Sequence, residues 1–71
     1  MEKQILLLKT SLAAWSDVKK IGILFDKISQ IVEWKIDLED NDKVLRIESY
    51  GLTEELIAVV LRRAGLKAEK L

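Results

Sequence analysis

The 71-residue chain contains no cysteine, no histidine and no proline. Without cysteine it can form no disulfide framework and perform no thiol chemistry. Because cysteine and histidine are both missing, the side chains that usually bind zinc, copper or nickel are missing as well. The only sulfur belongs to Met1. We therefore expect no cofactor and no tightly bound soft metal ion.

Net charge of one sign is also missing, since twelve basic residues balance twelve acidic ones. This balance argues against nucleic-acid binding and against a polybasic membrane anchor. The longest apolar run near the N-terminus, residues 5–8, is too short for a signal peptide or a membrane span. We expect one domain covering residues 1–71, in the cytoplasm and without membrane contact.

Catalytic groups are scarce too. There is no glycine-rich phosphate loop, and no pair of carboxylates is expected at an apolar cleft, so we expect no enzyme. The acidic segment "DLEDNDK", residues 37–43, lacks the glycine and the distant glutamate of a calcium-binding loop. It is typical of a solvated hairpin turn.

The first half of the chain predicts a strand, a helix and a strand. "QILLLK", residues 4–9, is expected to be a central strand buried on both faces. From Ser16, the expected N-cap, apolar residues recur with helical spacing. "IVEWKIDLE", residues 31–39, alternates between apolar and charged residues, as a half-buried strand does. The helix face comprises Val18, Ile21, Phe25 and Ile28, and the inner strand face Val32, Trp34, Ile36 and Leu38.

The second half predicts the same three elements. "KVLRIES", residues 43–49, should form a hairpin with the preceding strand and point Leu45 and Ile47 inward. Thr53 is a candidate N-cap for a second helix, and Gly65 is a natural residue to follow its last turn. Residues 66–71 should form a short edge strand. The expected apolar face of the second helix comprises Leu56, Val59, Val60 and Ala64.

The resulting order is β-α-β-β-α-β, in two halves of similar length. Right-handed crossovers would place both helices on one face of a four-stranded antiparallel sheet. The fold class that we predict is therefore α+β, a ferredoxin-like βαββαβ sandwich.

With the elements placed, three stretches resemble the heavy-metal-associated domain family, which includes copper chaperones and mercury-binding proteins. They are "LLLKTSLAAWSDVKKIGILFDKI", "VEWKIDLEDNDKVLRIES" and "LTEELIAVVLRRAGLKAEKL". The resemblance implies a metal site in which two cysteines, spaced C-x-x-C, lie just before the first helix. In this chain those positions hold Ala14 and Asp17. Near the "AG" corner, where the family often places Tyr or Lys, the chain has Leu66.

The degenerate site leaves few oxygen ligands. Asp17 is a hard ligand, and Ser11 and Ser16 could add hydroxyl groups, but calcium and magnesium prefer six or more oxygens. We interpret Asp17 as an acid that stabilises the helix N-terminus. Weak binding of a hard cation near Asp17 stays open.

Trp15 lies in the middle of this loop. The favoured interpretation is that it folds back over Leu12 and covers one end of the core. The other interpretation is an exposed anchor for a protein partner, since tryptophan is enriched in binding hot spots.

These observations favour a non-catalytic domain that has lost its metal ligands and acts in protein interaction or self-association. Ser11, Ala14, Trp15, Asp17 and Leu66 form its candidate docking region. The alternative is a chaperone-like or regulatory part in heavy-metal homeostasis, with residual metal binding or none.

Overall fold

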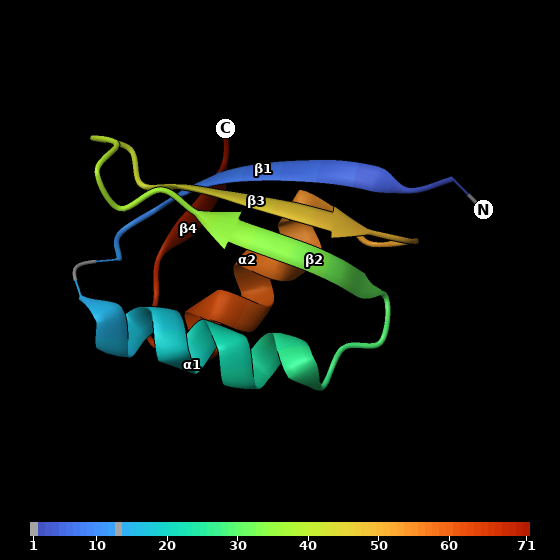
Figure 1. Ribbon diagram of the computed structural model, residues 1–71, viewed down its shortest axis with the longest axis horizontal. Helices are drawn as coiled ribbons and strands as arrows, with labels where there is room; N and C mark the ends of the chain where they lie inside the picture. The colour runs from blue at the N-terminus through green and yellow to red at the C-terminus, as the bar shows by residue number, and fades with distance from the viewer. Residues whose placement is uncertain (1, 13) are drawn as a thin grey trace.

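Four strands and two helices make up the computed structural model, which describes residues 2–12 and 14–71. Met1, the only sulfur, lies outside the described residues. In chain order the elements are β1 (Gln4–Thr10), α1 (Trp15–Asp26), β2 (Ile31–Ile36), β3 (Val44–Ser49), α2 (Glu54–Arg63) and β4 (Ala68–Lys70). The strands form one antiparallel sheet in the order β2-β3-β1-β4, and both helices cover the same face (Figure 1). The predicted ferredoxin-like α+β fold is confirmed.

β1 lies in the centre of the sheet, as predicted, with β3 on one side and β4 on the other. The prediction that both of its faces are buried is wrong. Leu6 and Leu8 are buried, whereas Ile5 and Leu7 on the opposite face are 42% and 38% exposed. The reason is that both helices pack against one face of the sheet, so the other face meets solvent.

The core lies between the sheet and the helices. Leu45 and Ile47 of β3 are buried there, as predicted, together with Ile21 and Phe25 of α1. The Phe25 ring meets the Trp34 ring edge to face, with the ring centroids 5.6 Å apart. This geometry is a favoured arrangement for aromatic pairs, and it fixes α1 beneath β2.

Val32 corrects the predicted inner face of β2. Ile31 pairs with Ser49 and Glu33 pairs with Glu48, so Val32 is an extra residue in a β-bulge. Val32 is 57% exposed, and Ile31 packs against the core in its place. The other predicted inner residues, Trp34, Ile36 and Leu38, are partly buried against the core.

α2 begins after Thr53, whose side-chain hydroxyl accepts a hydrogen bond from the Leu56 amide at 3.2 Å. The predicted N-cap is therefore confirmed. The predicted apolar face is wrong, since Leu56 and Val59 are 46% and 42% exposed. The helix carries two neighbouring apolar stripes, and the sheet covers the other one, which comprises Ile57, Ala58 and Leu61.

Gly65 ends α2 with a positive φ of 83°. Its amide donates to the Arg62 carbonyl, and the Leu66 amide donates to the Leu61 carbonyl, both at 3.0 Å. These two bonds are those of a Schellman motif, in which glycine occupies the left-handed position. The motif turns the chain back so that Leu66 enters the core, where it is 6% exposed.

We predict that replacing glycine with alanine changes the free energy of unfolding in opposite directions at Gly65 and Gly22. Gly65→Ala should lower the free energy of unfolding by about 1 kcal/mol, because its backbone lies in the left-handed region. Gly22→Ala should raise it by about 0.4–1 kcal/mol, because Gly22 lies inside α1 and an added Cβ would make only an ordinary contact, 3.6 Å from Trp34. Urea denaturation of both variants checks this. Equal signs would contradict it.

Glu48 on β3 accepts two charged hydrogen bonds, from Arg46 at 3.2 Å and from Lys3 at 3.5 Å. The Arg46 hydrogen bond lowers the pKa of Glu48 below its ordinary 4.5, although partial desolvation opposes this, and the Lys3 ammonium lowers it further. A lowered pKa in the folded state means that the carboxylate stabilises the fold above the ordinary pKa. This contribution is lost as the pH falls through the lowered value.

We therefore expect thermal stability to fall as the pH drops below about 4.5, and Glu48→Gln to weaken that dependence. Melting temperatures measured from neutral to acidic pH test this. Glu2→Gln is the control, because Glu2 makes no hydrogen bond or ion pair with the described residues. If wild type and Glu48→Gln lose stability in parallel as the pH falls, Glu48 does not supply the effect.

Candidate functional site

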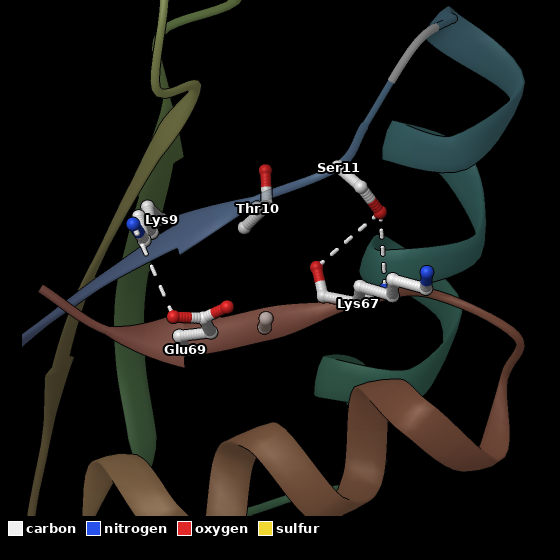
Figure 2. Close-up of a pocket in the computed structure, with 6 residues that line it drawn as sticks. Lys9, Thr10, Ser11, Lys67 and Glu69 are labelled. Carbon is white, nitrogen blue, oxygen red and sulfur yellow. Dashed lines mark hydrogen bonds and ion pairs between the residues drawn. The ribbon is translucent and has the colours of Figure 1, made fainter.

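The loop after β1 meets the turn after α2 at one corner of the molecule. The Ser11 amide donates to the Lys67 carbonyl at 3.0 Å, and the Lys67 amide donates to the Ser11 hydroxyl oxygen at 3.1 Å. Figure 2 shows the Ser11 side chain pointing across to Lys67, next to the β1–β4 pair. These bonds extend the β1–β4 pairing by one residue, since Thr10 already pairs with Ala68. The corner is therefore closed by backbone and hydroxyl groups.

Hydrocarbon fills the space beneath this closure. Leu12 is 1% exposed and Leu66 is 6% exposed, and both belong to the buried core. Leu66 thus lies at the predicted corner, but its side chain packs inward. The two segments therefore meet over packed apolar side chains.

Ala14 and Asp17 are one helical turn apart at the start of α1. The Asp17 amide donates to the Ala14 carbonyl at 3.0 Å, and Ala14 is the N-cap residue, without a side-chain cap bond. The predicted N-cap Ser16 is wrong: a cap at Ser16 would start the helix at Asp17, whereas α1 starts two residues earlier, at Trp15, with Ala14 as its N-cap. Asp17 lies in the first turn, where the helix dipole favours an acid, as predicted.

Trp15 is 71% exposed. The favoured prediction, that it folds over Leu12 and covers the core, is therefore wrong, and the prediction of an exposed position holds. Leu12 is buried without it. Trp15 precedes Val18 by one helical turn, and Val18 is itself only partly buried, so this end of the apolar stripe lies at the margin of the core.

The carboxylates of the hairpin between β2 and β3 stabilise the turn. Asp37 accepts a hydrogen bond from the Glu39 amide at 3.0 Å, and Asp40 accepts one from the Asp42 amide at 2.8 Å. Such side-chain bonds two residues along the chain are typical of Asx turns, so the predicted hairpin turn is confirmed. Among residues 2–12 and 14–71, no three Cys, His, Asp or Glu side chains are grouped to hold a metal ion.

A shallow surface pocket of about 170 Å³ borders the Ser11–Lys67 contact. Across it Lys9 and Glu69 form an ion pair at 3.9 Å, and both side chains are well exposed (Figure 2). Exposed ion pairs of this kind contribute little free energy. The pocket is lined by Lys9, Thr10, Ser11, Lys67, Ala68 and Glu69.

Neither of the two described helices has the length and apolar character needed to cross a membrane. Comparisons of the chain with protein-family models, with curated proteins and with solved structures find no match. The site is therefore interpreted from its own geometry and chemistry.

The lack of cysteine at positions 14 and 17 leads to a prediction about metal binding, and a double cysteine variant serves as its positive control. After equilibration with Cu(I), Zn(II) or Hg(II) and desalting, the wild-type protein should retain no stoichiometric metal, because no thiolate or imidazole is present. The double variant Ala14→Cys/Asp17→Cys should retain about one Cu(I), because two thiolates one turn apart at a helix N-terminus are suitable soft ligands. Stoichiometric retention by the wild type would contradict this prediction.

Proposed function

We propose that this chain is a cysteine-free relative of the heavy-metal-associated domains and acts as a non-catalytic protein-interaction module. Its docking surface comprises Ser11, after β1, and residues 14–17 at the start of α1. The single observation that carries the proposal is the exposed indole of Trp15, with 71% of its surface accessible to solvent.

The physical argument begins with the size of the indole. An aromatic side chain buries about 150–250 Å² in a contact, and tryptophan is among the residues that most often dominate binding energy. Trp15 therefore has most of its apolar surface available to a partner. Its indole N–H can also donate one hydrogen bond.

Preorganisation supports the same surface. Trp15 lies in the first turn of α1, and of the residues that precede it Ser11 is bonded to Lys67 and Leu12 is buried. An anchor held in this way loses less conformational entropy when a partner binds. The neighbouring side chains, Ala14 and Ser16, are small and exposed, so they leave the indole accessible.

The experiment places a photoreactive residue at position 14, next to the intact Trp15, and a second one at position 23 as a control. Ile23 is 61% exposed on the same helix, so it matches Trp15 as an exposed apolar side chain. The partner captured from position 14 is then purified. Its affinity is measured by calorimetry for wild type, Trp15→Ala and Ile23→Ala.

We expect Trp15→Ala to weaken binding at least about tenfold, as a hot-spot residue does, and Ile23→Ala to change it by less than about twofold. Both variants should keep the wild-type melting temperature within a few degrees, because both side chains are exposed. Equal weakening by the two variants, or none by Trp15→Ala, would refute Trp15 as the anchor.

A further inference from the structure

β2 forms a free edge of the sheet, since it pairs only with β3 among the described strands (Figure 1). Just beyond β2, the Asp37 amide donates to the Val44 carbonyl at 3.2 Å. Bonded and non-bonded residues alternate along an antiparallel pair. The backbone groups of Trp34 and Ile36 therefore point away from β3, where another strand could accept and donate hydrogen bonds.

On the face of the sheet that the helices leave uncovered, two side chains of β2 lie opposite side chains of β3 that carry the same charge. Glu33 lies opposite Glu48, and Lys35 lies opposite Arg46. Like charges directly opposite each other destabilise a strand pair. Glu48 already bonds Arg46 and Lys3, whereas Glu33 and Lys35 make no ion pair with any described residue.

We propose that a second copy of this chain pairs with the free edge, β2 against β2, antiparallel about Trp34. In this register Glu33 lies opposite Lys35 of the second copy, and by two-fold symmetry the same attraction occurs twice. The two side chains that face like charges within one molecule thus meet opposite charges across the interface. The result is one continuous eight-stranded sheet.

The charges select this register over its neighbours. A shift that centres the pair on Glu33 places the two Glu33 side chains opposite each other. A shift that centres it on Lys35 opposes the two lysines, and also Glu33 and Asp37. Sliding one strand by a single residue, so that Glu33 lies opposite Trp34 of the second copy, would turn the helices of the two copies to opposite faces of the sheet. Charges on an edge strand usually discourage pairing, but here their alternating sign leaves one register attractive.

The interface would also cover apolar surface. Trp34 is only partly buried in one molecule, where it packs against Phe25. At the two-fold axis it would meet Trp34 of the second copy and lose contact with water. The bulge at Val32 limits the regular stretch to residues 33–36. We therefore expect a small, reversible interface of less than about 1,200 Å².

This inference goes beyond the proposed function, because it assigns a second surface that does not include Trp15. The two can fail separately: loss of self-association leaves docking at Trp15 intact, and Trp15→Ala should leave self-association intact.

The test is a charge swap followed by sedimentation equilibrium, from about 10 μM to about 1 mM, the range suited to weak interfaces. Glu33→Lys and Lys35→Glu each place like charges across the interface and should weaken dimerisation about tenfold. The double variant Glu33→Lys/Lys35→Glu should restore it. An equimolar mixture of the two single variants should form a mixed dimer, because every pair across that interface is attractive.

Unfolding of the single variants would not explain weakened dimerisation that the double variant and the mixture restore. Each single variant removes a like-charge pair with β3, so its melting temperature at low concentration should equal or exceed that of the wild type. Glu55→Lys on α2 and Lys70→Glu on the opposite edge make the same charge changes away from β2 and should leave dimerisation unchanged.

Two results would overturn the proposal. One is a wild-type protein that stays monomeric up to about 1 mM. The other is a dimer that neither single variant weakens and whose single variants form no mixed dimer, since such a dimer uses another surface.

Discussion

The central position of β1 determines the rest of the structure. Because β1 pairs with β3 on one side and β4 on the other, it joins the middle and the end of the chain into one sheet. Its pairing with β4 continues into the contact between Ser11 and Lys67, so the first loop and the turn after α2 must meet. With both helices on one face, Leu6 and Leu8 enter the core and the alternate residues face solvent.

At the corner where these segments meet, buried residues lie beside exposed ones. Leu12 and Leu66 are buried, the Ser11 amide donates to the Lys67 carbonyl, and the Ser11 hydroxyl accepts from the Lys67 amide. Trp15, by contrast, is 71% exposed. The proposed docking role of Trp15 rests on this exposure, because an exposed aromatic side chain has apolar surface available for a contact.

Local signals in the chain were sufficient for much of the fold. Hydrophobic periodicity gave the order of the elements, Thr53 marked the start of α2, and Gly65 marked its end, because caps and periodicity act within a few residues. Of the predicted docking residues, Trp15 is exposed, whereas Leu66 is buried in the core. Ser16 was wrong as a cap because the helix includes two more residues, Trp15 and Ser16, and the Asp17 amide donates to the Ala14 carbonyl, while Ala14 provides no side-chain cap.

By itself the sequence determined the fold class, the absence of sulfur and imidazole ligands at the corner, and the balance of charge. Only the tertiary structure decided which apolar residues are buried. It covered Ile57 and Leu61 and left Leu56 exposed, and a bulge turned Val32 outward. It also exposed Trp15 and set Glu33 opposite Glu48. The reason is that burial and cross-strand pairing depend on segments distant in the chain, whereas periodicity and capping depend on neighbours.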